Sequence, residues 1–410
     1  MSYARWAPDS RRIITVCEFN IRMTIWSLID RSTCYINFPK YSDKGISFTT
    51  NGYFMALAER KDSKDYIGVY YTGDWSLVSH FQVDSYDLQD ICWSKDNTAI
   101  IVWDSVLECK FFIYSPTGNL ISSYEAYQMN LGIKSLNISP NGHYISIGYY
   151  DQTVRLFNHI TWKLIIDFQH TSTITDSTNI NIFKEEEIEE FSYSGDSKKT
   201  TKYVDVQAPI KLNVIKPVLD KPNPAIGVAD ISWSYDSNFI ATKNDNIPNV
   251  LWIWQVSSLS LHTVIIQQKP IKNFQWSPNE HILLIVTENS KLYSFTLTNV
   301  YVVELVSDLN YNLAVNKVNW NTDGKSFVVS DKNYMVIGYP EINENENEEV
   351  VNTDNNLGNE HEIIEENYTE NYDEGDNMGS YKENTTNYNN EDGEGDGEGV
   401  GINSRSYSDK

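Results

Sequence analysis

The chain carries a recurring pattern of short stretches in which apolar and polar residues alternate, separated by polar turns. Each unit has an apolar or aromatic anchor, a turn of the Ser-Pro-Asp-Gly kind, and two apolar stretches, the second ending near an aromatic residue. Alternation with a period of two predicts strands, and Pro, Asp, Asn and Gly favour tight turns between them. The anchors are Trp6, Phe48, Trp93, Ile138, Trp233, Trp276 and Trp320.

The spacing of these anchors predicts the fold. Successive anchors are separated by 42, 45, 45, 95, 43 and 44 residues. A period of about 40–45 residues built from short strands is typical of a β-propeller with one four-stranded blade per repeat. The sequence therefore predicts an all-β, WD40-type β-propeller with seven recognisable repeats. The Trp-Asp pair that names this repeat is degraded, because none of the seven units ends in it.

The single long gap contains an insertion. Residues 171–210 are rich in Ser, Thr and Glu, and we interpret them as a polar loop inserted in the propeller. The flanking segments 179–183 and 210–215 alternate as strands do. An eighth, cryptic blade made from these two segments is therefore an alternative to seven blades.

The acidic charge of the chain is concentrated at its end. The net charge is -24, of which residues 341–410 carry -18, so residues 1–340 carry only -6. Asn, Glu, Asp and Gly dominate this end, and such a composition predicts a disordered tail after a propeller domain of residues 1–340. The tail is interpreted as a solubilising extension or a docking arm for a basic partner. The sequence has no cluster of Lys and Arg of the kind that binds phosphates, so direct nucleic-acid binding is not predicted.

The sequence offers no catalytic, cofactor-binding or metal site. It lacks the G-x-S-x-G, H-E-x-x-H and Walker motifs, and its seven histidines are scattered without a partner at metal spacing. Ser139, Asp151 and His170 resemble a triad in composition only. We interpret Asp151 and His170 as part of a structural hydrogen-bond network within the blades. The predicted protein is not an enzyme and has no small-molecule substrate.

Two polar segments are the candidate partner-binding loops. The first, residues 243–249, is interpreted as a long exposed connection between the third and fourth strands of its blade. The second, residues 59–65, is interpreted as the same connection in an earlier blade, so both are expected on the same face. The alternative, that the first loop only braces a neighbouring strand, stays open. The candidate residues are Lys243, Asn244, Asp245, Asn246 and Asn249 in the first loop and Glu59, Arg60, Lys61 and Asp62 in the second.

Targeting signals are absent from the sequence pattern. No apolar run reaches about 18 residues, so no membrane span is predicted, and the chain opens directly in a repeat unit. Four widely spaced cysteines without a C-x-x-C pair are typical of a reducing compartment. We therefore expect the protein in the cytoplasm.

Four peptides outside the generic repeat point to a particular family. Residues 53–62, 131–135, 158–163 and 242–254 resemble, in order, the WD-repeat family of centrosomal and spindle-pole proteins commonly called WDR-eight. The resemblance spans about residues 3 to 339.

The resemblance implies a cytoskeletal scaffold at the centrosome, microtubule-organising centre or spindle pole. Such a scaffold binds a coiled-coil microtubule-anchoring protein and helps minus-end anchoring, spindle assembly and, where cilia exist, cilium assembly. The alternatives are a generic WD-repeat adaptor in RNA processing or translation, and a propeller hydrolase.

The chain departs from this family at its start. Family members resemble it only after a further stretch of about two repeats, and the sequence opens inside a blade whose first inner strand is expected to be absent. A propeller removes exposed edges by mixing strands from both ends of the chain in one blade. We therefore expect a ring that is incomplete at the N-terminus, as a shortened gene model or an internal start would produce.

Overall fold

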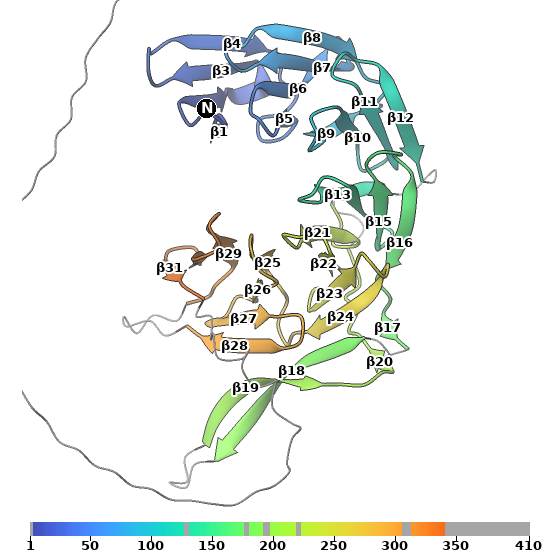
Figure 1. The fold of residues 1–410 in the computed structure, drawn as a ribbon, viewed down its shortest axis with the longest axis vertical. Helices are drawn as coiled ribbons and strands as arrows, with labels where there is room; N and C mark the ends of the chain where they lie inside the picture. The colour runs from blue at the N-terminus through green and yellow to red at the C-terminus, as the bar shows by residue number, and fades with distance from the viewer. Residues whose placement is uncertain are drawn as a thin grey trace, which may run out of the picture. The chain divides into compact units, whose positions relative to one another are not determined.

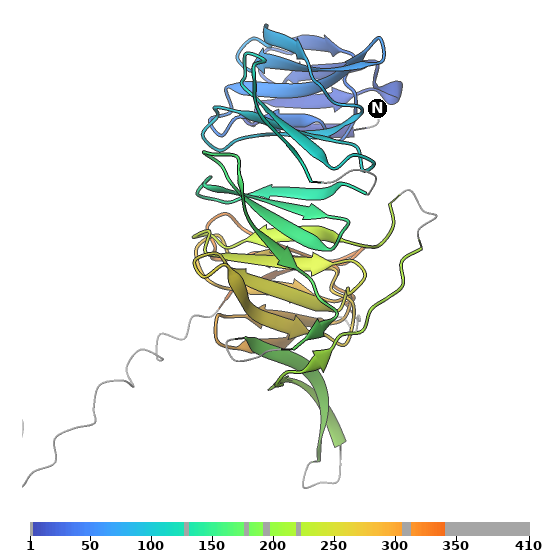
Figure 2. The same cartoon turned by 90° about the vertical axis from the view of Figure 1, so that its right-hand side faces the viewer.

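A computed structural model describes residues 3–126, 131–175, 180–191, 197–218, 223–305 and 313–340 of the chain. The described residues belong to one compact unit, Met1–Ile342. The predicted acidic tail, residues 341–410, lies outside the described residues. The compact unit is all-β: seven successive sheets, each built on an antiparallel meander, follow one another in chain order (Figures 1 and 2), and a separate two-stranded sheet lies in the insertion. This confirms the predicted propeller class.

Each sheet is a meander in which consecutive strands pair with each other. The first sheet holds β1 (Tyr3–Trp6), β2 (Arg12–Val16), β3 (Arg22–Ser27) and β4 (Thr33–Asn37), with a short 3-10 turn, η1 (Glu18–Asn20), between β2 and β3. The second holds β5 (Ile46–Phe48), β6 (Phe54–Lys61), β7 (Lys64–Tyr71) and β8 (Leu77–Gln82). The third holds β9 (Leu88–Trp93), β10 (Ile100–Asp104), β11 (Lys110–Tyr114) and β12 (Leu120–Glu125).

The remaining sheets repeat the plan. The fourth holds β13 (Ile133–Ile138), β14 (Tyr144–Tyr149), β15 (Thr153–Asn158) and β16 (Leu164–Gln169). The fifth is built on β21 (Val228–Trp233), β22 (Phe239–Asn244), β23 (Val250–Gln255) and β24 (Ser260–Ile266). The sixth holds β25 (Asn273–Trp276), β26 (Leu283–Val286), β27 (Lys291–Phe295) and β28 (Val300–Glu304). The seventh holds β29 (Lys317–Trp320), β30 (Phe327–Ser330) and β31 (Met335–Gly338).

The turn after each anchor is closed by the side chains that the sequence pattern singled out. In the fourth unit, the Ser139 hydroxyl donates to Asn141 Oδ1 at 2.7 Å, and Gly142 takes a φ of +76°, which a residue without a Cβ adopts at little cost. Ser94 makes the equivalent bond to Asp96, and Ser234 makes it to Asp236. These local bonds fix each first hairpin and so bring the apolar faces of its strands into register.

The core lies between the sheets. Six clusters of buried apolar side chains occur in the described part of the chain, and each is shared by two consecutive sheets. Ile14 and Met23 of the first sheet, for example, pack with Met55 and Leu57 of the second. Because each sheet presents one face to the preceding sheet and the other to the following sheet, both faces of a strand are apolar where two neighbours are present.

The insertion is a β-hairpin, so the predicted polar loop at 171–210 and the alternative eighth blade are both wrong. β18 (Asn181–Phe191) pairs with β19 (Ser197–Asp205) and, in parallel, with β24, which extends the fifth sheet to six strands. β20 (Ile210–Lys211) pairs instead with β17 (Thr173–Ile174). Ile182 and Phe183 are buried, and opposite charges such as Glu189 and Lys199 face each other across the hairpin. These contacts stabilise strands where composition alone indicated a loop.

Glu185 fastens this hairpin to the propeller. Its buried carboxylate accepts hydrogen bonds from the Tyr293 hydroxyl at 2.8 Å and from the Gln268 N–H at 2.7 Å. We expect Glu185→Gln to lower the local opening free energy of the hairpin by about 1 kcal/mol, because a neutral amide loses the charge-assisted part of both bonds. Hydrogen exchange of the β18 amides should then be about fivefold faster. Glu187→Gln, on an exposed carboxylate of the same strand, is the control and should leave exchange unchanged.

The expectation that the first inner strand is absent is also wrong. β1 pairs with β2 from Tyr3↔Val16 to Trp6↔Ile13, so the first sheet has four strands. The short segment before the first turn is enough for a strand because all four of its residues pair with β2. Within the described residues, the seventh sheet has three strands. Its last strand, β31, pairs with β30 and has no partner on its other edge.

Candidate partner-binding face

The two predicted binding loops occupy equivalent positions in their sheets. One is the β6–β7 hairpin and the other joins β22 to β23, so both connect the second and third strands. The prediction that they connect the third and fourth strands is wrong, since the anchor strand that precedes each turn is itself the first strand. Because both loops have the same place in the repeat, they belong to the same face of the propeller.

The β6–β7 hairpin holds some of its predicted residues inward and leaves others exposed. Asp62 and Ser63 form the two-residue turn with φ of 52° and 60°, the geometry of a tight hairpin. Lys61 and Asp62 are exposed, whereas Glu59 is buried. Glu59 accepts a hydrogen bond from the Tyr70 hydroxyl at 2.6 Å, and its burial raises the pKa of its carboxyl group. Glu59 is therefore part of the sheet's interior.

A buried ion cluster lies beneath the same hairpin. Lys40, whose side chain is 4% exposed, places its ammonium 2.9 Å from Asp65, which is 2% exposed, and 2.7 Å from Asp87. Arg60 reaches Asp87 at 2.5 Å. Burial opposes the ionisation of Asp87, but the bonds from Lys40 and Arg60 outweigh it and lower its pKa below the usual value. Arg60 thus joins the exposed hairpin to a fixed internal charge network.

The loop between β22 and β23 is mostly buried. Lys243, Asn244 and Asn246 are all buried, which contradicts the prediction that they are exposed for a partner. The amides of Asn244 and Asn246 both donate to Gln152 Oε1 of the fourth sheet, at 3.1 and 3.0 Å. Lys243 pairs with Asp230 at 2.5 Å. The bracing alternative therefore describes this loop, since the side chains of Lys243, Asn244 and Asn246 all bond to neighbouring parts of the fold.

The partly exposed members of this loop are also held by neighbours. Asp245 accepts from the ammonium of Lys134 at 2.6 Å, and Lys134 is almost fully buried. Lys134 also donates to the Ile226 carbonyl at 2.7 Å. Asn249 donates to the backbone carbonyls of Gln267 and Gln268. The loop is a clamp between the fourth and fifth sheets rather than a free surface.

Three exposed apolar residues close to Arg60 along the hydrogen-bonded backbone were missed by the sequence analysis. Phe19, Ile21 and Phe38 are exposed, and Phe19 is 91% exposed. The Phe38 N–H donates to the Ile21 carbonyl, and the Arg60 N–H donates to the Phe38 carbonyl, both at 3.1 Å. We call Phe19, Ile21, Phe38, Arg60 and Lys61 the Phe19 patch.

The backbone under the Phe19 patch is strained. Phe19 has a φ of 63° and Phe38 a φ of 64°, in the left-handed region that bulky residues seldom adopt. Each such residue costs on the order of 1–3 kcal/mol and tends to occur where function requires the conformation. No sequence pattern signals this conformation in a phenylalanine.

Asp151 and His170 do not share one network. His170 is buried, bonds the Gln152 carbonyl at 3.0 Å and lies 2.7 Å from the Thr242 hydroxyl of the fifth sheet. The Trp254 indole donates to the same hydroxyl at 2.9 Å. Asp151 instead accepts from Thr153 and pairs with Arg155. His170 therefore joins two sheets, while Asp151 closes its own hairpin.

The triad composed of Ser139, Asp151 and His170 is not assembled. The Ser139 hydroxyl is used in its turn, and His170 contacts neither Ser139 nor Asp151 among the bonds described above. Burial lowers the pKa of His170 to about 4, so its imidazole is neutral at pH 7. These residues stabilise the sheets.

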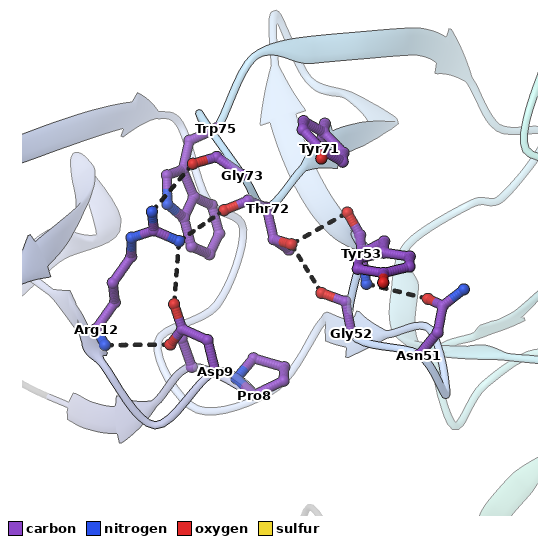
Figure 3. Close-up of a pocket in the computed structure, with 11 residues that line it drawn as sticks. Pro8, Asp9, Arg12, Asn51, Gly52, Tyr53, Tyr71, Thr72, Gly73 and Trp75 are labelled. Atoms are coloured by element: carbon purple, nitrogen blue, oxygen red, sulfur yellow. Dashed lines mark hydrogen bonds and ion pairs between the residues drawn. The ribbon is translucent and has the colours of Figure 1, made fainter. Parts of the chain in front are cut away.

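A cavity of about 260 Å³ opens between the first and second sheets (Figure 3). Arg12 spans it, donating to the carbonyls of Thr72 and Gly73 at 2.9 and 3.0 Å and pairing with Asp9 at 3.0 Å. The guanidinium also lies near the Trp75 ring. Because Arg12 of the first sheet bonds to Thr72 and Gly73 of the second, the cavity lies at a bracing contact between the two sheets.

The described residues contain free thiols but no cluster of metal ligands. No group of three or more His, Cys, Asp or Glu side chains in the described ranges is arranged to hold a metal ion. All four cysteines are free thiols. No helix long and apolar enough to cross a membrane occurs in the part of the chain that the structure describes.

Comparison with known proteins gives one family model and several relatives. The model for the WD domain, G-beta repeat, matches residues 118–158. The chain is 36% identical over 352 residues to the mouse WD repeat-containing protein WRAP73, covering 83% of this chain and 76% of the relative. An uncharacterized WD repeat-containing protein of Schizosaccharomyces pombe is 25% identical and covers 70% of this chain and 57% of its own length.

Two weaker similarities complete the comparison. The Restriction of telomere capping protein 1 of Candida tropicalis is 26% identical over 57% of this chain and 20% of its own length. A chain from a crystal structure of the mitotic checkpoint complex aligns over 80% of this chain and 83% of its own, with 8% identity and a TM-score of 0.46. None of the three relatives named has a name that denotes an enzyme.

Proposed function

Because this chain belongs to the WD-repeat family that includes mouse WRAP73, a membership that its four distinctive peptides predicted, we propose that it is a non-catalytic scaffold that binds other proteins at the centrosome or spindle pole. The observation that carries the binding function is the Phe19 patch. Apolar side chains exposed on a strained and hydrogen-bonded backbone lower the entropic cost of docking a partner.

The chemistry of the patch suits one kind of partner. Phe19, Ile21 and Phe38 supply apolar area, and Arg60 and Lys61 lie at its border. An amphipathic helix presents an apolar stripe at intervals of three and four residues, flanked by charged side chains. The proposed partner is therefore a helix of a coiled-coil protein that anchors microtubules, and the proposed site of action is the microtubule-organising centre in the cytoplasm.

The test is to express the tagged full chain from its own locus, image it through division beside a spindle-pole marker, and identify co-purifying proteins by mass spectrometry. The double variant Phe19→Asp/Ile21→Asp should keep its thermal unfolding temperature within a few degrees yet lose the partner, with at least a tenfold drop in recovery. The matched control is Ile160→Asp, an exposed apolar residue in the β15–β16 connection.

Each outcome decides between the candidate functions. Foci at the poles with a coiled-coil partner that depends on the patch support the proposal. Diffuse or nuclear signal with ribosomal or RNA-processing proteins would overturn the spindle-pole role and favour the generic adaptor. Recovery of the same partner by the double variant would show that the Phe19 patch is not its binding site.

A further inference from the structure

The fourth strands of the second, third and fourth sheets, which lie on the outside of the molecule (Figure 1), expose apolar side chains in pairs. The second member of each pair lies at a β-bulge, because the pairing with the third strand skips it. Bulges re-aim side chains, and an exposed apolar group repeated at one register is typical of an interaction surface. The pairs are Leu77 and Val78 of β8, Leu120 and Ile121 of β12, and Leu164 and Ile165 of β16.

The fifth sheet has the same bulge and shows what can be added beyond it. His262 is skipped between Leu261 and Thr263 where β24 pairs with β23. The next four residues of β24, Thr263 to Ile266, pair along their outer edge with β18, and this pairing is parallel. The fold therefore already contains one strand added to a bulged outer edge.

The side chains of β18 fill the spaces on both sides of β24. Ile182 is buried in the cluster shared with the fourth sheet, and Phe183 is buried in the cluster shared with the sixth. The centre of the Phe183 ring lies 6.5 Å from that of Phe295. Val300, which pairs with Phe295, packs on the same cluster and is partly buried. An added strand thus covers an apolar residue of the outer strand that follows.

The second sheet repeats this frame around an uncovered edge. Phe81 has the place of Ile265 after the bulge, and its ring lies 5.5 Å from that of Tyr114 in the third sheet. Leu120 pairs with Tyr114 at the register that Val300 has in the sixth sheet, yet Leu120 is 48% exposed. Among the strands that the structure describes, β7 is the partner of β8, and its outer edge is free.

The start of β12 is held close to this edge. The Ser79 hydroxyl of β8 donates to the Pro116 carbonyl at 2.5 Å. Gly118 has a φ of +94°, and a Cβ at this position would lie only 2.7 Å from the Phe81 ring. Because the β11–β12 turn is packed this tightly on β8, Leu120, two residues beyond Gly118, has a fixed place beside the edge.

We propose that the outer edge of β8 binds an extended peptide segment of a partner protein, which runs parallel to β8 and packs an apolar side chain on Leu120. The model for this occupant is β18 on β24, which has the same direction and an apolar residue, Phe183, at the same place. Main-chain hydrogen bonds supply the affinity of such added strands, and the side-chain contacts supply the specificity.

The neighbouring peptide position gives the site a second requirement. The residue before the apolar one opposes His80, where β24 has Val264, so a polar side chain is expected there. The site uses no residue of the Phe19 patch, so it is independent of the proposed scaffold function.

The test uses the full chain and a fluorescent peptide with the sequence of residues 180–186 carrying Ile182→Thr. Fluorescence anisotropy should show saturable binding, and Leu120→Asp should raise the dissociation constant at least about tenfold, because a charge would be desolvated against the apolar side chain. Leu107→Asp, on an exposed leucine in the β10–β11 connection, is the control and should leave the constant unchanged. Thermal unfolding of both variants verifies that the sheets are intact.

Hydrogen exchange and methylated peptides test the edge and the mode of binding. The peptide should slow exchange of the β8 amides and leave those of β4, an outer strand without the bulge, unchanged. Peptides N-methylated at alternate residues should differ, since only the set of N–H groups that faces β8 is needed. Absence of saturable binding, protection of another outer strand in place of β8, or equal binding of both methylated peptides would overturn the proposal. Protection of β8 that grows with the concentration of the chain alone would assign the edge to a second copy and overturn it as well.

Discussion

Replacing Asp65 by alanine is expected to lower the free energy of unfolding by about 3–5 kcal/mol. The substitution removes a carboxylate held 2.9 Å from the ammonium of Lys40, and both side chains are almost fully buried. Asp65 also accepts the Leu88 N–H at 2.8 Å. Loss of the buried partner of a buried ion is strongly destabilising, because the ion keeps its desolvation cost and loses much of the compensating attraction. Asp87 stays 2.7 Å from Lys40, but it is 48% exposed and so offsets only part of the loss. Urea unfolding of the wild type and the variant measures the difference.

Two further variants separate this cause from the loss of a side chain in general. Asp62→Asn removes an exposed charge in the turn of the same hairpin and keeps a residue type that tolerates its φ of 52°, so its effect should stay within about 0.5 kcal/mol. The double variant Lys40→Met/Asp65→Leu should recover most of the stability lost by Asp65→Ala, since a buried ion pair can be replaced by apolar residues of similar volume. If Asp65→Ala lowered the free energy of unfolding by less than about 1 kcal/mol, the view that the buried ammonium of Lys40 depends on Asp65 would be contradicted.

The repeat could be predicted from the sequence because its signal is local. Each anchor is followed by a turn whose side chains bond within a few residues, as Ser234 does with Asp236, and such bonds do not depend on distant parts of the chain. The apolar alternation that follows determines which residues enter the core. The seven sheets follow directly from these two features.

The exposure of the candidate partner-binding residues was harder to predict than the repeat, because it depends on neighbouring sheets. Asn244 and Asn246 form a polar stretch that is typical of an exposed loop, yet both amides bond to Gln152, 92 and 94 residues away. Glu59 is polar but bonds to Tyr70 inside its own sheet. Polarity indicates that a side chain needs hydrogen-bond partners, and it does not indicate whether those partners are water or protein.

The insertion and the Phe19 patch were missed for related reasons. The glutamates of β18 resemble a solvated loop in composition, and their stabilising contacts lie across the hairpin and in the sixth sheet. The left-handed backbone of Phe19 and Phe38 has no sequence signal, because such conformations are usually taken by glycine or asparagine. Features that arise from distant contacts or strain therefore require the structure.

The unfolding free energy is expected to fall by about 2 kcal/mol between pH 7.5 and pH 5 on account of His170 alone. Burial lowers the pKa of this imidazole to about 4, against 6.5 for its ordinary value. The unfolded chain therefore takes up the proton first as the pH falls. The stability that depends on neutral His170 is fully present above about pH 6.5 and is lost progressively as the pH approaches 4.

Comparison with a variant that cannot titrate at this position isolates the effect. His170→Asn removes the ionisable group and lowers stability at neutral pH, because Thr242 and the Gln152 carbonyl lose a bonding partner. Its stability should nevertheless depend less steeply on pH than that of the wild type, since all carboxylates and the other histidines are common to both proteins. Urea unfolding at intervals from pH 7.5 to pH 5 gives both curves. Parallel curves would mean that His170 takes up its proton equally well in the folded chain, and so is not sealed between the fourth and fifth sheets.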